Sequence, residues 1–148
     1  MNSQEIMAQI QGVIDDAKTA VLATSDAQGR PHVRWVTPAI LKGHPASVFM
    51  VTSPAFAKAH DVKDNPKVEW MFQTRALDKV INARGTVALL DSPSVQSEVL
   101  EAVGPRLRTF WHIANDQHAM VVLETVIEEA TFFVPAKGTK ETVSFAKK

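Results

Sequence analysis

A short stretch that begins at Thr52 contains residue types suited to binding a phosphate group. Thr52 ends an apolar run, Ser53 suits a helix N-cap, and Pro54 suits the first helical position. The start of a helix attracts anions because its backbone N–H groups are unpaired and its dipole is positive there. Lys58 lies about one turn further on, and helical side chains lean toward the N-terminus, so its ammonium can reach the same anion. The simpler interpretation is that Ser53 only caps the helix and Lys58 is a solvated surface residue.

Arg34 is the second candidate for a binding role. It lies in the middle of the segment 31–38, PHVRWVTP, and alternation along a strand places it on the face opposite Val33 and Trp35. A guanidinium can bind a phosphate or a carboxylate through two parallel hydrogen bonds. An exposed strand arginine paired with a cross-strand acid explains the residue equally well, and its position relative to Lys58 decides between the two.

Other site chemistries have little support in the sequence. The chain contains five histidines, His32, His44, His60, His112 and His118. They form no HExxH motif and show no clustered ligand spacing, so we expect no metal site. The motifs GxSxG, GxxxxGK[ST] and GxGxxG are also missing. Trp111, between Phe110 and His112, could stack on a flat ligand, although packing at a barrel end or a dimer seam is the preferred interpretation.

The composition favours one small globular domain. The 148 residues are 45% hydrophobic and 22% charged, and 16 basic residues balance 16 acidic ones. Because these charges cancel, the protein has no large electrostatic field of one sign, and we do not expect nucleic acid or a membrane to be its main partner. Because the N-terminus carries acids and no apolar run approaches a bilayer span, we expect a cytoplasmic protein. The chain has no cysteine, so any redox chemistry must come from a bound cofactor.

The elements that must position these residues are mostly strands. Helical spacing of apolar residues predicts an amphipathic helix over about 3–17, and Ser92-Pro93 opens a second one over 92–103, followed by a less regular stretch to 117. A short helix is also expected between Ser53 and Asn65. Strand patterns cover 18–25, 31–40, 47–52, 67–74, 79–91 and 118–134. Six strands with few helices predict a mainly β (α+β) fold, a closed or nearly closed antiparallel barrel, with a charged tail over 135–148.

Three segments together resemble the pyridoxamine 5′-phosphate oxidase-like FMN-binding split barrels. These are GRPHVRWVTP, SVFMVTSPAFAKAHDVKDNPKVEW and VINARGTVALLDSP, and the similarity spans about residues 18–134. The short chain resembles the general stress protein branch of this family. The most specific part is the spacing of Thr52, Lys58, Asn65 and Pro66. The resemblance implies a single domain over 1–148, a six-stranded antiparallel split β-barrel with short flanking helices.

The resemblance also implies a cofactor, its ligands and a partner. Thr52 and Lys58 would hold the FMN phosphate, the strand around Arg34 would run along the isoalloxazine edge, and FMN would lie at the interface of a homodimer. Trp111 would line the flavin of the partner subunit. The full set of cofactor-binding residues expected on this basis is Arg34, Trp35, Val36, Thr37, Val51, Thr52, Ser53, Lys58 and Trp111. No catalytic side chain is assigned.

Two departures from the family narrow the expected function. Phe56 and Ala57 stand where the family often has serine and arginine, and no substrate-binding arginine and histidine segment follows Phe133. We therefore expect an FMN-dependent oxidoreductase that acts on a small molecule other than the vitamin. A deazaflavin-dependent reductase, a non-catalytic flavin sensor or storage protein, a haem protein and a plain interaction domain are the alternatives.

Overall fold

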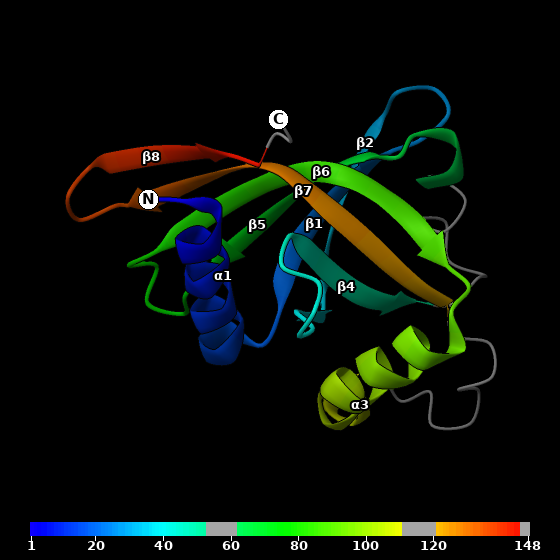
Figure 1. Ribbon diagram of the computed structural model, residues 1–148. Coiled ribbons are helices and arrows are strands. Elements are labelled where there is room, and N and C mark those ends of the chain that lie inside the picture. Colours follow the sequence, from blue (N-terminus) through cyan, green and yellow to red (C-terminus); the bar gives the residue numbers. More distant parts are fainter. Residues whose placement is uncertain (53–61, 111–120, 146–148) are drawn as a thin grey trace.

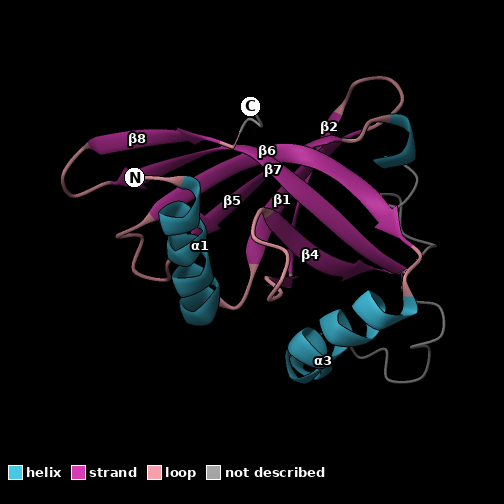
Figure 2. Ribbon diagram, in the orientation of Figure 1, coloured by secondary structure: helices cyan, strands magenta, loops and turns pink. Residues whose placement is uncertain are grey.

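The computed structural model describes residues 1–52, 62–110 and 121–145 (Figure 1). In these residues two longer helices flank one antiparallel sheet of eight strands (Figure 2). The helices are α1 (Ser3–Ala17) and α3 (Pro93–Phe110). The strands are β1 (Ala20–Ser25), β2 (Pro31–Val36), β3 (Pro38–Ala39), β4 (Ser47–Thr52), β5 (Lys67–Gln73), β6 (Val80–Leu90), β7 (Val121–Val134) and β8 (Thr139–Ser144).

Helix α1 has the boundaries that the sequence predicts. The Asn2 side chain accepts a hydrogen bond from the Glu5 backbone N–H at 2.8 Å, and the Glu5 carboxylate accepts one from the Asn2 N–H at 3.1 Å. This capping box satisfies two of the free donors at the helix start. Lys18 ends the helix in the left-handed conformation, and its N–H donates to the carbonyl of Ile14.

The strand order requires the sheet to curl. The order is β2–β1–β5–β6–β7–β4–β3, and β8 pairs with the second half of β7. The first and last strands of this order, β2 and β3, are separated in the chain only by Thr37. The two ends of the sheet must therefore come together, which confirms the antiparallel split barrel. The long, bent strands β6 and β7 cross the whole molecule in Figure 1.

The number of strands differs from the prediction. The expected strand over 31–40 is divided into β2 and β3, because Pro38 has no backbone N–H and starts a new strand after the break at Thr37. The segment expected as a charged tail contains β8, which pairs with β7 from Glu129↔Ser144 to Val134↔Thr139. Charged side chains hid this strand from the sequence pattern because β8 exposes all but one of its residues.

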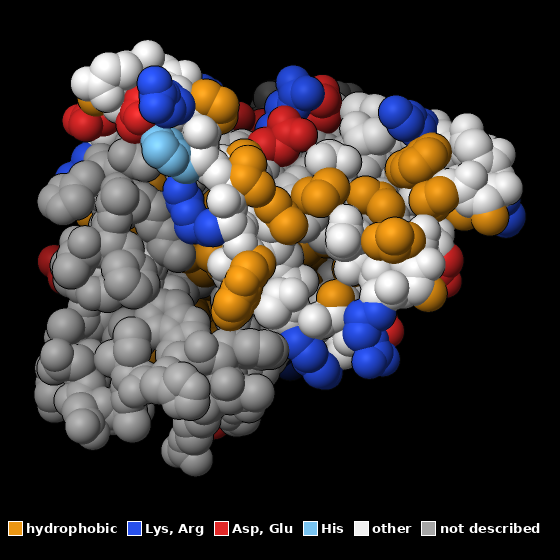
Figure 3. Space-filling model, turned by 180° about the vertical axis from the view of Figure 1, so that it is seen from behind, with side chains coloured by type: hydrophobic (Ala, Val, Ile, Leu, Met, Phe, Trp, Pro, Cys, Tyr) orange, Lys and Arg blue, Asp and Glu red, His pale blue; other side chains and the backbone are white. Residues whose placement is uncertain are grey.

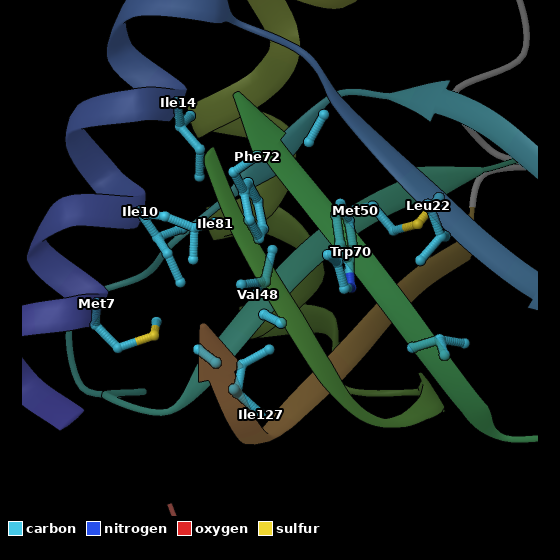
Figure 4. Close-up of a cluster of buried hydrophobic side chains, with 14 of the residues drawn as sticks. Met7, Ile10, Ile14, Leu22, Val48, Met50, Trp70, Phe72, Ile81 and Ile127 are labelled. Atoms are coloured by element: carbon cyan, nitrogen blue, oxygen red, sulfur yellow. The ribbon is translucent and has the colours of Figure 1, made fainter. Parts of the chain in front are cut away.

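The main hydrophobic core fills the inside of the curled sheet, and α1 closes one end of it (Figure 4). Figure 4 shows Ile10 and Ile14 of the helix facing Ile81 and Phe72. Trp70 and Phe72 lie on the buried side of β5, as alternation predicts, and their rings stack with centroids 5.4 Å apart. The buried Trp70 indole N–H donates to the hydroxyl of Thr125 at 3.0 Å.

A second, smaller core lies on the outside of β3 and β4, under α3. It consists of Ala39, Leu41, Phe49, Val51, Val99, Val103 and Val122, with Leu90, Val95 and Leu100 packed against it. Helical spacing predicts that Val95, Val99 and Leu100 face inward, and this packing confirms it. The predicted end of this helix near Val103 is wrong, because α3 continues past Gly104 and Pro105 to Phe110. Local propensity is a weak guide where packing of the preceding turns holds a helix in place.

A glycine inside a strand pattern predicts a bulge or a close backbone approach, and Gly85 marks such an irregularity in β6. The pairing of β6 with β7 shifts register between Arg84 and Gly85, and a β-carbon on Gly85 would overlap the carbonyl oxygen of Val126. Only glycine allows this close backbone approach. None of the helices in the described ranges is both long and apolar enough to cross a lipid bilayer.

Candidate functional site

The strand residues expected to bind the cofactor gather where β2 ends and β4 ends. β3 pairs with β4 through Pro38↔Met50, so Thr37 and Thr52 lie at the same end of this antiparallel pair. Val36 and Val51 are their neighbours in the chain, and Arg34 lies two residues before Val36 on β2. Three further residues of the expected set, Ser53, Lys58 and Trp111, lie outside the described residues.

Two buried hydroxyl groups lie at this end of the β3–β4 pair. Thr37 is 4% exposed and Thr52 is fully buried, and within the described part of the chain neither Oγ1 atom has a hydrogen-bond partner. A buried polar group without a partner destabilises a protein by about 1–3 kcal/mol, so such groups are rare and need an explanation. A polar group of a bound ligand would supply the missing partner.

Arg34 faces the inside of the barrel. Its Nη1 donates a hydrogen bond to Oγ1 of Thr24, a buried residue on β1, at 3.0 Å. The residue directly across from it on β1 is Leu22, which belongs to the main core. The guanidinium is therefore held by a neighbouring hydroxyl on the inner face of β2, and it leans toward the hairpin end of the strand, because Thr24 pairs with His32.

Trp35 and Val33 face the opposite side, as alternation predicts. They are 56% and 69% exposed, and cross-strand pairing sets Trp35 beside Val21, which in turn lies beside Met71. An open pocket of about 320 Å³ adjoins Trp35 and includes Leu77 in its lining. Figure 3 shows hydrophobic side chains gathered in a band on the back of the molecule. A contiguous exposed apolar surface of this kind is typical of a contact surface.

Asn65 fastens the chain that follows the expected phosphate-binding segment. Its side-chain amide donates to the carbonyl oxygens of Ser25, the last residue of β1, at 3.4 Å, and of Asp26, the first residue of the turn between β1 and β2. The next residue, Pro66, accepts a hydrogen bond from the Val87 N–H at 2.8 Å. Asn65 and Pro66 thus hold the start of β5 against the β1–β2 turn and against β6. The sequence marks Asn65 only as a helix end and does not predict its contact with this turn.

Asp26 and His32 are polar residues that the sequence does not single out for a site. Asp26 Oδ2 lies 2.9 Å from His32 Nε2, and Asp26 Oδ1 accepts hydrogen bonds from the backbone N–H groups of Gln28 and Arg30. The hydrogen bond from His32, helped by the one from the Arg30 backbone, lowers the pKa of the Asp26 carboxyl below its usual range. In the sequence, Asp26 and Gly29 indicate only a turn between two strands. The pairing of Asp26 with His32 depends on how the hairpin closes, so the sequence does not predict it.

A second pocket opens where β1 and β5 separate. Their pairing ends at Ala23↔Glu69, and beyond it lies an open pocket of about 420 Å³ that Lys67 and Arg84 help to line. Both cations already have acidic partners. Lys67 Nζ lies 3.5 Å from a carboxylate oxygen of Glu128. Arg84 Nε lies 3.9 Å from a carboxylate oxygen of Glu69 and 3.6 Å from one of Glu129. The charges of this pocket are balanced internally, which makes it a poorer anion site than the end of β4.

The chain belongs to the pyridoxamine 5′-phosphate oxidase family, whose model matches residues 6–133. Among curated proteins, it is similar to the pyridoxine/pyridoxamine 5′-phosphate oxidases of Anaeromyxobacter dehalogenans and Rhodopseudomonas palustris. The identities are 31% over 123 residues and 35% over 124 residues, covering 82% and 83% of this chain. The matches cover 60% and 56% of those oxidases, so the chain spans little more than half of their length.

Solved structures share the fold at low sequence identity. A NimC/NimA family protein from Clostridium acetobutylicum has a TM-score of 0.74 at 23% identity, with 97% of this chain and 94% of that one covered. General stress protein 26 from Bacillus anthracis has a TM-score of 0.73 at 16% identity, with 95% and 99% covered. An FMN-binding protein related to pyridoxamine 5′-phosphate oxidase, from Nostoc punctiforme, has a TM-score of 0.65 at 11% identity and 97% coverage of both chains.

Proposed function

We propose that this protein binds FMN at the end of β4, beside β2, and uses it in oxidation–reduction of a small molecule. The observation that carries the proposal is the pair of buried hydroxyls of Thr37 and Thr52, which lack partners within the described residues. Their oxygens can donate to a phosphate or to the polar edge of a flavin. A related structure of the same fold is that of an FMN-binding protein, which supports the choice of cofactor.

The neighbouring residues suit such a ligand. The guanidinium of Arg34 can bind the phosphate monoester of FMN, with Lys58 as a further cation from the sequence pattern. The buried side chains of Val36 and Val51 exclude water from the ends of their strands. When bound, FMN supplies the hydride chemistry, and the chain's own residues set its orientation and its access to solvent.

We further propose that the protein works as a cytoplasmic homodimer with the cofactor near the subunit interface. The exposed apolar surface around Val33 and Trp35 supports this, because an isologous dimer would bury it against its own copy. Arg34 and Trp35 lie on opposite faces of the same strand. Strand β2 could therefore serve the cofactor on one face and the partner on the other.

Titration of the purified apoprotein with FMN, FAD and a deazaflavin tests the proposed cofactor, with flavin fluorescence as the signal. We expect saturable binding of one FMN per subunit and weaker binding of the other two flavins. Preference for the deazaflavin would assign the site to the alternative reductase class. Absence of flavin binding would overturn the proposal. Stopped-flow mixing of the FMN complex with NADH or NADPH then separates an oxidoreductase from a flavin sensor, which would stay oxidised.

A further inference from the structure

His32 lies on the same face of β2 as Arg34. The two residues are separated by one position, and strand geometry places alternate side chains on one face about 7 Å apart. His32 pairs across the hairpin with Thr24, the residue whose hydroxyl also accepts the hydrogen bond from Arg34. The imidazole and the guanidinium therefore flank one buried threonine. The His32 side chain is 42% exposed, so the imidazole is accessible to a ligand.

Asp26 holds the imidazole in a defined orientation. One carboxylate oxygen lies 2.9 Å from His32 Nε2, while the other is bound to the backbone N–H groups of Gln28 and Arg30 at 3.0 and 2.9 Å. With Nε2 directed to the carboxylate, Nδ1 is left as the second polar atom of the ring. In the imidazolium form both nitrogens are donors, so Nδ1–H can bind an anion while the Nε2–H stays on Asp26.

The same turn contacts the chain just before β5. Asn65 donates to the carbonyl oxygens of Ser25 and Asp26, so this chain lies against the residue that orients His32. His32 and Arg34 lie on β2, between the turn at Asp26 and the break at Thr37. An anion bound by the Arg34 guanidinium, which leans toward Thr24, would lie near His32, the residue that pairs with Thr24.

We propose that His32, oriented by Asp26, is a further ligand of the phosphate group that Arg34 binds. The inference rests on the proposed FMN site and adds a residue to it. Its ligand is the phosphate monoester of the cofactor and not the isoalloxazine ring. His32 and Arg34 together give the phosphate one ring N–H donor and one guanidinium donor from a single strand.

The test compares FMN with riboflavin, which lacks the phosphate, in the wild type and in His32→Gln. We expect the variant to bind FMN about three- to tenfold more weakly, the effect of one lost hydrogen bond, and to bind riboflavin unchanged. Lys67→Gln is the matched control, because it removes one exposed cation from β5. The control should leave the ratio of the two affinities unchanged. Asp26→Asn should also lower the affinity for FMN relative to that for riboflavin, as His32→Gln does, because it weakens the interaction that orients the imidazole.

Each other outcome has a definite meaning. An equal fall in the affinities for FMN and riboflavin would assign His32 a purely structural role in the hairpin and overturn the inference, as would an unchanged FMN affinity. Thermal unfolding of each apoprotein identifies variants that have lost the hairpin fold. If the wild type binds neither flavin, the proposed function fails. If the wild type prefers FMN and His32→Gln keeps that preference in full, only the inference about His32 fails.

Discussion

At the scale of single residues, the buried threonines fall into two kinds. Some serve the fold through a hydrogen bond to another side chain, and others have a hydroxyl that could serve a ligand. Thr125 is buried and accepts the indole N–H of Trp70, whereas Thr52 is buried without a partner in the described residues. The sequence identifies Thr52 through its place before Ser53 and Lys58. It cannot identify the orphaned hydroxyl, because that property depends on what β7 and the core place around the strand end.

Thr52→Val tests this difference directly. Removing an unpartnered buried hydroxyl should raise the free energy of unfolding of the apoprotein by about 1 kcal/mol and weaken FMN binding about five- to tenfold. The matched control is Thr125→Val, which leaves the Trp70 N–H unpaired and should lower the free energy of unfolding by about 1–3 kcal/mol. Urea unfolding and flavin titration measure the two effects. A Thr52→Val apoprotein less stable than the wild type would contradict the interpretation of this hydroxyl.

At the scale of elements, the sequence predicts what depends on local periodicity. Apolar spacing defines α1, alternation defines the buried side of β5, and Gly85 signals the irregularity in β6. Strand β8 and the last turns of α3 escape prediction. Their stability comes from pairing with β7 and from packing against the sheet, which no local pattern contains.

Gly85→Ala tests the close approach of β6 to β7. The added methyl group would overlap the carbonyl oxygen of Val126, so we expect the free energy of unfolding to fall by roughly 1–3 kcal/mol. Gly12→Ala is the control, and we expect it to change the free energy of unfolding in the opposite direction. Gly12 lies on the exposed side of α1 with no atom near the position of a β-carbon, and Gly12→Ala should stabilise the helix by about 0.5–1 kcal/mol. Equal effects of the two substitutions in chemical denaturation would rule out the steric explanation.

At the scale of the whole molecule, the order of elements along the chain is enough to predict a curled antiparallel sheet but not its strand order. That order depends on β7, whose first half pairs with β4 and whose second half pairs with β8. The end of β4 and the strand β2 lie far apart in a flat drawing of the sheet. Curling brings them together and creates the candidate site.

The exposed apolar surface around Trp35 is the part of the molecule that we expect to form the dimer interface. We expect the wild type to sediment as a dimer at micromolar concentration, and Trp35→Lys to shift it toward the monomer, because a lysine cannot be buried unpaired in an apolar interface. Leu89→Lys, at another exposed apolar position, should leave the dimer intact. A wild type that sediments as a monomer, or equal dissociation in both variants, would contradict this use of the surface.

A crystal structure of the protein with FMN tests the central claim most directly, because it locates the ligand as well as detecting it. The account predicts a phosphate within hydrogen-bond distance of the Arg34 guanidinium, with the Thr52 or Thr37 hydroxyl bonded to the same ligand. A phosphate bound away from Arg34, beside Lys67 and Arg84 in the pocket between β1 and β5, or no FMN at all under saturating conditions, would contradict it.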